Sequence, residues 1–243
     1  MLRLEPPLPG TSIWPDVNGK DVMPVPSDEI AALIVDIDGT LIDSNYQHVL
    51  AWQRAFAAFG LAAEAWKVHR YVGKGGDQMV TSVAGEAAEQ EHGDEIREAE
   101  SANFQEIIDE VRPFEDAPRF LTQMHDRGLQ LVLASSAKGD EVDHYLDLLD
   151  VPEAIDGHTS SADVEATKPE PDLVLAALEK CEGRRALMIG DSIWDVESSK
   201  RAGIDCLAVL TGGFSKSELR SAGASEIQPS LSDLTHLPAW RSG

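Results

Sequence analysis

Residues 33–41 read Leu-Ile-Val-Asp-Ile-Asp-Gly-Thr-Leu, an apolar run that ends in two carboxylates and a glycine. The run is typical of a buried strand, and because side chains alternate across a strand, Asp36 and Asp38 project to the same side. Open α/β sheets place their ligands at the carboxyl ends of such strands. Two like charges so close together are costly unless a cation or a proton separates them. The stretch therefore predicts a divalent-metal site with a second acid held ready for proton transfer; the alternative is a buried strand that ends in an acidic turn.

The composition is that of an ordinary globular protein. The chain has 243 residues, of which 42% are hydrophobic and 6% aromatic, enough to bury a core as one domain or as one domain with an insertion. No apolar run approaches the roughly 20 residues that a membrane span needs. The first 26 residues carry six prolines and do not resemble a secretory signal. Two cysteines in no metal-ligand spacing, Cys181 and Cys206, favour a cytoplasmic location.

The formal net charge is −23. So acidic a chain argues against nucleic acid or an anionic membrane as partner, since both require clustered lysine and arginine. The acidity is compatible with adaptation to salt or simply with high solubility. An anionic substrate would have to be attracted locally, by a metal ion or a few lysines. Nothing in the sequence indicates an oligomeric state.

Residues 44–112 are predicted to be almost wholly helical. Apolar side chains recur at three- and four-residue steps before Gly60 and mark one amphipathic helix; they are Val49, Trp52, Ala55, Phe56 and Phe59. Further helical pieces are predicted over residues 62–70 and 93–111, the second with an acidic, solvated face and ended by Pro113.

From residue 116 on, helical and strand-like segments alternate. The predicted strands cover residues 129–134, 186–189 and 206–210, and the predicted helices cover residues 118–127, 173–179 and 196–202. This alternation predicts a parallel sheet with helices on both faces. We therefore predict an α/β fold, a doubly wound parallel sheet interrupted by an inserted α-helical domain. The predicted parts are a proline-rich arm (1–27), a core (28–43 and 116–243) and a helical cap (44–115).

Two further candidate sites are phosphate-binding in character. Ser135 and Ser136 follow the predicted strand 129–134, where hydroxyls and backbone N–H groups can hold a phosphoryl oxygen, although most such pairs are turn residues. Lys168 precedes a proline, which keeps it out of helical geometry. A lysine fixed there can neutralise a carboxylate and a phosphoryl oxygen, whereas the commoner fate of a lysine is an exposed loop.

A second pair of acids follows another apolar strand. Asp191 and Asp195, in Gly190-Asp191-Ser192-Ile193-Trp194-Asp195, are one helical turn apart and can face one cation together. Hard oxygen ligands without cysteine or paired histidine favour Mg²⁺ over zinc. The alternative is a helix N-cap followed by a solvated acid.

Taken in order, these segments resemble the four motifs of the haloacid dehalogenase superfamily. The motifs are Asp36-Ile37-Asp38-Gly39-Thr40-Leu41, Ser135, Lys168, and Gly190-Asp191 with Asp195. The resemblance covers about residues 30–210, and its first and last motifs are highly specific. It implies a Rossmann-like core, and the insert resembles the helical cap of the phosphoglycolate phosphatase and β-phosphoglucomutase branch.

The resemblance implies a role for each motif residue. Asp36 matches the nucleophile that takes the phosphoryl group as an aspartyl phosphate. Asp38 matches the general acid for the leaving group and then the base that activates water. Ser135 and Lys168 match the residues that hold and neutralise the transferred phosphoryl oxygens.

The same resemblance implies a Mg²⁺ site. Its ligands would be Asp36, Asp191 and the backbone carbonyl of Asp38, with Asp195 bound directly or through water. The second acid of the first motif argues against a dehalogenase, because the haloacid dehalogenases of this superfamily lack it and need no proton for the leaving group.

Three cap or loop residues are candidates for substrate binding, namely His48, Lys74 and Ser136. His48 follows Asp38 by ten residues, and the mutase branch has a histidine at the matching place; the alternative is a partly exposed helix histidine. Lys74 lies in a glycine-rich turn that leads into a helix with Asp77 as a candidate N-cap. Its ammonium can point at an anionic or hydroxylated substrate end, or form only a surface pair of small worth.

The sequence thus predicts a Mg²⁺-dependent phosphatase that hydrolyses a small phosphorylated metabolite. One alternative is a phosphomutase of the β-phosphoglucomutase type, which the inexact match of Lys74 to that enzyme's sugar-phosphate-binding arginine makes less favoured. The other alternative is a non-enzymatic protein on an inherited scaffold, which the four intact motifs argue against.

Overall fold

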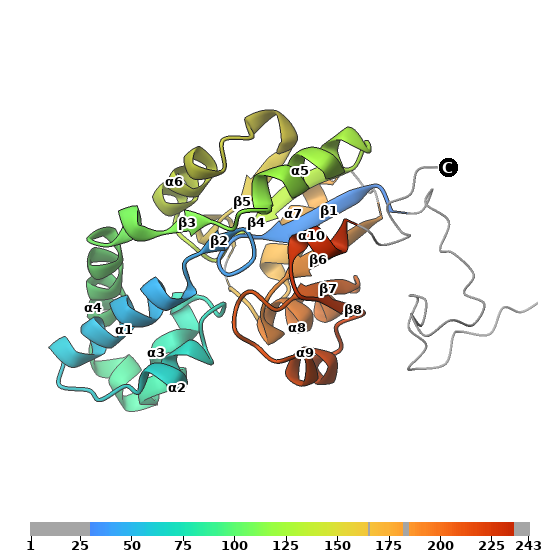
Figure 1. Cartoon of the computed structure of the whole chain (residues 1–243). Coiled ribbons are helices and arrows are strands. Elements are labelled where there is room, and N and C mark those ends of the chain that lie inside the picture. The colour runs from blue at the N-terminus through green and yellow to red at the C-terminus, as the bar shows by residue number, and fades with distance from the viewer. Residues whose placement is uncertain (1–29, 165, 182–184, 236–243) are drawn as a thin grey trace, which may run out of the picture.

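A computed structural model describes residues 30–164, 166–181 and 185–235 of the protein. The predicted proline-rich arm, residues 1–27, lies outside the described residues. The described part contains a parallel sheet with the strand order β5-β4-β1-β6-β7-β8 (Figure 1). Its strands are β1 (Ala32–Asp36), β4 (Gln130–Ala134), β5 (Gly157–Thr159), β6 (Ala186–Gly190), β7 (Cys206–Val209) and β8 (Glu226–Gln228).

Helices cover both faces of the sheet, so the predicted doubly wound α/β fold is confirmed. Alternate residues of β1 enter opposite clusters: Leu33 and Val35 pack on one face, and Ala32 and Ile34 pack on the other. A strand buried on both faces reads as a continuous apolar run, which explains the sequence of β1. One face is covered by α5 (Ala117–Asp126), α6 (Gly139–Leu149) and α10 (Leu231–Leu234), and the other by α7 (Asp172–Lys180), α8 (Ile193–Ala202) and α9 (Lys216–Ala222).

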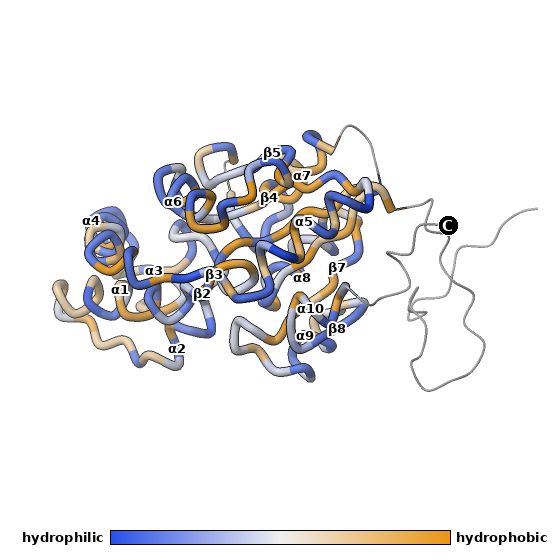
Figure 2. Tube along the Cα trace, turned by 45° about the horizontal axis from the view of Figure 1, so that its top comes forward, coloured by the Kyte–Doolittle hydropathy of each residue, from blue (hydrophilic) through white to orange (hydrophobic). Residues whose placement is uncertain are grey.

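The hydropathy of the chain follows this layering. In Figure 2 the central strands are mainly orange, whereas α4 and α6 carry much blue on their outer sides. Among the described residues, none of the helices combines the length and the apolar character that crossing a bilayer requires.

Four helices between the first two motifs form a separate group, here called the helical insert. They are α1 (Asn45–Ala58), α2 (Ala65–His69), α3 (Gly76–Ala84) and α4 (Glu86–Gln105), followed by a short 3₁₀ turn, η2 (Ile108–Glu110). The insert has its own apolar cluster, which includes Phe56, Met79 and Ile96. It is joined to the sheet by β2 (Ile42–Asp43) and β3 (Arg112–Pro113), which pair antiparallel. Figure 1 shows the insert, blue to green, to one side of the sheet.

Three details differ from the sequence prediction. The helix predicted over residues 93–111 begins earlier, after Gly85 with a φ of 91°, and ends at Gln105 rather than at Pro113. Asp77 is wrong as the N-cap of α3: Gly75 holds that position, and Asp77 lies in the first turn. Asp191 precedes α8 and is not part of a helical turn with Asp195, because Ser192 is the N-cap.

Several short elements were not predicted. They are the strands β2, β3, β5 and β8, the helices α6, α9 and α10, and the 3₁₀ turns η2, η3 (Pro152–Ala154) and η4 (Ser161–Asp163).

Candidate active site

The predicted site residues converge at the carboxyl end of the sheet. Asp36 is the last residue of β1, Ser135 follows β4, and Asp191 follows β6. Lys168 comes from the loop before α7 and is 1% exposed. A cavity of about 290 Å³ lies over this edge and is lined both by these loops and by the helical insert.

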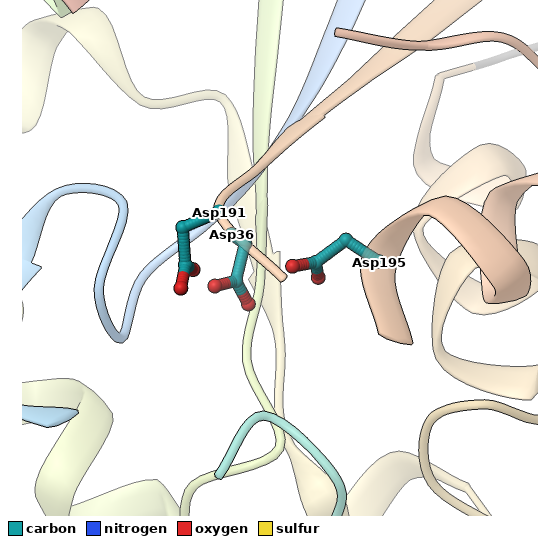
Figure 3. A group of neighbouring side chains, drawn as sticks. All are labelled: Asp36, Asp191 and Asp195. Atoms are coloured by element: carbon teal, nitrogen blue, oxygen red, sulfur yellow. The ribbon is translucent and has the colours of Figure 1, made fainter. Parts of the chain in front are cut away.

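Three carboxylates form a buried cluster, and one of them, Asp36, lines the cavity. Asp36, Asp191 and Asp195 each offer an oxygen, and these oxygens lie within 4.8 Å of one another. The side chains are nearly inaccessible, and in Figure 3 the carboxylate of Asp36 lies between the other two. Burial, and then the charge of Asp195, raises the pKa of Asp36 well above its ordinary value. Burial raises the pKa of Asp191 to about 7, and the charge of Asp195 adds to this effect.

The ammonium of Lys168 lies on one side of the acid cluster. It contacts Asp36 and lies 2.7 Å from Asp195 Oδ1. Burial alone would lower the pKa of Lys168, but the charges of Asp195 and Asp36 raise it. The other oxygen of Asp195 accepts hydrogen bonds from the backbone N–H of Ser192 (3.0 Å) and from its hydroxyl (2.6 Å). Asp195 is thus held in place by both of its oxygens.

The cluster fits a hard divalent cation. One ammonium stands against three buried carboxylates, and carboxylate oxygens are the ligands that Mg²⁺ takes in proteins. The backbone also approaches Asp191 closely: a Cβ at Gly39 would lie 2.6 Å from Asp191 Oδ2, and one at Gly212 would overlap the same atom. Gly39 has a φ of 79°, so both the turn and the space at this position require glycine.

Asp38 lies beside this cluster in a network of its own. Its carboxylate accepts hydrogen bonds from the hydroxyls of Ser44 (2.6 Å) and Ser135 (3.3 Å), and it forms an ion pair with His48 (3.3 Å). Burial would raise the pKa of Asp38, but the hydrogen bond and charge of His48, with hydrogen bonds from Ser44 and Tyr145, lower it to about 2. The side chain therefore faces the cavity as a carboxylate at neutral pH.

His48 is a helix residue with 14% of its side chain exposed, and it joins the network of Asp38. Its Nε2 faces Asp38, its Nδ1 lies 3.2 Å from Glu100, and its ring stacks on Phe104 with centroids 3.9 Å apart. Burial would lower the pKa of His48, but the hydrogen bonds to Asp38 and Glu100 raise it well above its ordinary value. The hydroxyl of Tyr145 lies 3.4 Å from Nε2.

The remaining predicted residues have different surroundings. Ser135 is fully buried and accepts a hydrogen bond from the backbone N–H of Ala137 (3.0 Å). The buried hydroxyl of Ser136 has no hydrogen-bond partner among the described residues, and Ser136 lines the cavity. Lys74 also lines the cavity, but its ammonium donates to Ser82 (3.2 Å) and lies 4.7 Å from the ring centroid of Trp194. A contact between Lys74 and substrate stays a prediction.

The helical insert contacts the loops that carry the site. The Thr167 hydroxyl donates to the Asp77 carboxylate of α3, and the Gln78 side chain donates to the Thr167 carbonyl (3.1 Å). Arg70 pairs with Glu218 of α9 at 2.5 Å. These contacts place the insert over the cavity, next to Lys168.

Sequence reasoning missed several residues of the cavity wall. Glu100 and Arg97 of α4 and Glu141 of α6 line the cavity. Arg97 is held in a fork by Glu89, with N–O distances of 2.9 and 2.8 Å. No signal in the sequence separated these residues from the solvated faces of acidic helices.

Comparison with known proteins gives matches over most of the chain. A family model described as haloacid dehalogenase-like hydrolase matches residues 33–209. A phosphoglycolate phosphatase of Aquifex aeolicus is 28% identical over 184 residues, covering 74% of this chain and 84% of its own length. The pyrophosphatase PpaX of Bacillus velezensis is 26% identical over 211 residues, covering 86% of this chain and 96% of its own length. The crystal structure of a hydrolase from Pseudomonas syringae superposes with a TM-score of 0.79 at 30% identity, covering 84% of this chain and 96% of that one.

Proposed function

Because the chain belongs to the haloacid dehalogenase-like hydrolases, we propose that it is a Mg²⁺-dependent phosphatase that hydrolyses a small phosphate monoester. The observation that carries this proposal is the buried cluster of Asp36, Asp191 and Asp195, with the ammonium of Lys168 against it and Asp38 beside it. Phosphoryl transfer depends mainly on positioning and charge neutralisation, and this cluster supplies both.

Asp36 is the proposed nucleophile. Its carboxylate oxygen attacks phosphorus, the bond from phosphorus to the leaving oxygen breaks, and an aspartyl phosphate forms. Asp38, itself a carboxylate, passes a proton from the His48 imidazolium to the leaving alkoxide. Asp38 then takes a proton from the water that hydrolyses the aspartyl phosphate and returns it to His48, which regenerates Asp36 and releases phosphate. The contacts with Ser44 and His48 hold the Asp38 carboxylate at the cavity for this exchange.

The cluster supplies the charge neutralisation. Asp36, Asp191 and the backbone carbonyl of Asp38 would hold Mg²⁺, with Asp195 bound directly or through water. The metal would neutralise charge on the transferred phosphoryl group. Lys168 and Ser135 would hold the phosphoryl oxygens.

The helical insert is proposed as a cap (44–115) on a catalytic core (28–43 and 116–243). Its contacts with Thr167 support a role in covering the cavity, where exclusion of water strengthens the electrostatic interactions. His48, Lys74 and Ser136 are the proposed contacts to substrate. A cavity of about 290 Å³ suits a small metabolite. The charge of −23 argues against nucleic acid or an anionic membrane as partner, and the scarcity of cysteine favours a cytoplasmic location.

A β-phosphoglucomutase-type phosphomutase is the second candidate. One observation favours it: His48 lies 3.3 Å from Asp38, where the mutase branch is expected to place its histidine. The two candidates share the aspartyl phosphate and differ in whether water or a sugar phosphate receives the phosphoryl group.

The test is phosphate release from a panel of small phosphate esters, with Mg²⁺ and with chelator. Asp36→Asn is the test variant, and Asp126→Asn, an exposed aspartate of α5, is the matched control. Release that requires Mg²⁺ and disappears only in Asp36→Asn supports the phosphatase. No release, together with isomerisation of a hexose phosphate primed by its bisphosphate, would replace the phosphatase with the mutase.

A further inference from the structure

We propose that Glu141 determines the substrate class, by accepting hydrogen bonds from hydroxyl or ammonium groups of the leaving group and by repelling leaving groups that carry a negative charge. This inference rests on the proposed phosphatase function. The substrate would then be a phosphate monoester of a small polyol or amino alcohol rather than of a carboxylate.

Glu141 is a largely buried acid whose carboxyl group faces the cavity. It lies in the first turn of α6, its side chain is 4% exposed, and it lines the cavity. No hydrogen bond or ion pair reaches it from any residue within the described ranges. Burying a charge without a partner is costly. Proximity to the N-terminus of a helix moderates that cost but does not explain why the side chain faces the cavity. A ligand group that donates hydrogen bonds would explain it.

Above its raised pKa, Glu141 is a charged acceptor that faces the cavity. Burial raises the pKa of Glu141 to about 7; the charge of His48 opposes this effect, and the charges of Glu100 and Asp38 add to it. Of these groups, His48 pairs both with Glu100 and with Asp38, which passes the proton to the leaving group in the proposed mechanism. A donor placed beside Glu141 is therefore close to the bond that breaks.

The cations that line this part of the cavity are already engaged. Both nitrogens of His48 face carboxylates, Asp38 and Glu100. The fork of Arg97 binds Glu89, and Lys138 donates to the Ser101 hydroxyl at 2.7 Å.

A negatively charged leaving group would face the acidic side of this wall. The ammonium of Lys74 lies over the ring of Trp194, and the ammonium of Lys168 pairs with Asp36 and Asp195 of the acid cluster. Such a leaving group would meet Glu141 and Glu100, whereas the ammonium groups of Lys74 and Lys138 already donate to the Ser82 and Ser101 hydroxyls. The proposed substrate class therefore differs from that of the relative named phosphoglycolate phosphatase, whose named substrate carries a carboxylate.

Three two-carbon esters test the proposal, because they differ only in the group at the far carbon. They are 2-hydroxyethyl phosphate, 2-aminoethyl phosphate and 2-phosphoglycolate. At pH 8.5, above the raised pKa of Glu141, we expect the wild-type kcat/KM to be at least about tenfold lower for 2-phosphoglycolate than for the better of the other two. Repulsion between unit charges several ångströms apart is enough for a factor of this size at an effective dielectric constant near 20.

The variants are Glu141→Gln and, as a matched control, Asp143→Asn, an exposed acid of the same helix. Glu141→Gln should reduce the discrimination against 2-phosphoglycolate about tenfold, whereas Asp143→Asn should leave it unchanged. Unfolding curves of both variants check that they fold. A better rate with 2-aminoethyl phosphate assigns an ammonium to the site, and a better rate with 2-hydroxyethyl phosphate assigns a hydroxyl.

Two results would overturn the inference while the phosphatase stands: a wild-type preference for 2-phosphoglycolate, or the same discrimination in Glu141→Gln as in wild type. Absence of phosphate release from these and all other esters would instead refute the phosphatase, and the inference with it.

Discussion

The ammonium of Lys168 lies 2.7 Å from Asp195 Oδ1 in an environment where both side chains are 1% exposed. The same ammonium contacts Asp36. Lys168→Met should therefore leave two buried acids without their counter-ion. We expect the free energy of unfolding in chelator to fall by about 3–5 kcal/mol, and kcat to fall by a factor of about 10²–10³. Urea unfolding and phosphate release measure the two effects.

The control for this variant is Lys216→Met, an exposed lysine at the start of α9. Addition of Mg²⁺ should restore part of the stability of Lys168→Met, because the metal supplies positive charge to the same acids. A Lys168→Met protein as stable in chelator as the control would contradict the role of this ion pair.

The acid cluster predicts a metal-dependent stability. Mg²⁺ that binds only the folded chain stabilises it by about 2.7 kcal/mol at a concentration 100 times its dissociation constant. We expect Mg²⁺ to raise the melting temperature, a chelator to reverse the rise, and Asp191→Asn to lose most of it. Equal rises in Asp191→Asn and in Asp126→Asn would show that the ion binds elsewhere.

The acid cluster itself was predictable from local sequence. Asp36 ends one apolar strand and Asp191 directly follows another, and the ends of neighbouring parallel strands meet at one edge, so spacing alone brings them together. The helix α6 carried a readable signal as well. Its buried residues Val142, Tyr145 and Leu149 follow helical spacing, and the segment was nevertheless not predicted as a helix.

The wall of the cavity was not predictable in the same way. Glu100 lies on a helix rich in exposed acids, and only the packing of α4 against α1 places it next to His48. Periodicity separates apolar from polar positions, but it does not separate a polar residue that faces solvent from one that faces a cavity. The strand β8 was not predicted for a simpler reason: of its three residues only Ile227 is buried, so no alternating apolar pattern is visible.

Glu141 predicts a pH dependence of stability. Burial raises its pKa from an ordinary value of 4.5 to about 7. Between these values the unfolded chain has lost the proton and the folded chain keeps it, so the free energy of unfolding falls as pH rises and becomes level above pH 7. The full effect of this group is about 3 kcal/mol.

The charges that act on Glu141 are those of His48, Glu100 and Asp38, which lie on other elements, and that of Asp140, which lies on the same helix. The difference in unfolding free energy between Glu141→Gln and wild type isolates Glu141 from other titrating groups. This difference should grow in favour of the variant between pH 5 and pH 7.5. A difference that stays constant over this range would mean that Glu141 titrates normally.

Gly75 controls the approach of the helical insert to the loop that carries Lys168. Its backbone conformation (φ −71°, ψ 159°) is open to alanine, but a Cβ there would overlap the Thr167 side chain. Gly75→Ala should therefore push α3 away from Thr167 and weaken the hydrogen bond to Asp77. A lost hydrogen bond to a charged group is worth about 1.5–3 kcal/mol, so kcat/KM should fall about tenfold or more.

Two further variants make this prediction specific. Gly139→Ala is the matched control, because a Cβ at this position of α6 meets nothing within 4 Å. Thr167→Val removes the hydroxyl that donates to Asp77 while keeping the side-chain volume, and it should reproduce the loss. If Gly75→Ala and Gly139→Ala have the same kcat/KM, the contact between α3 and Thr167 does not contribute to closure of the cavity. If kcat/KM falls in Gly75→Ala but not in Thr167→Val, the effect comes from the overlap of the new Cβ with Thr167 and not from the lost hydrogen bond.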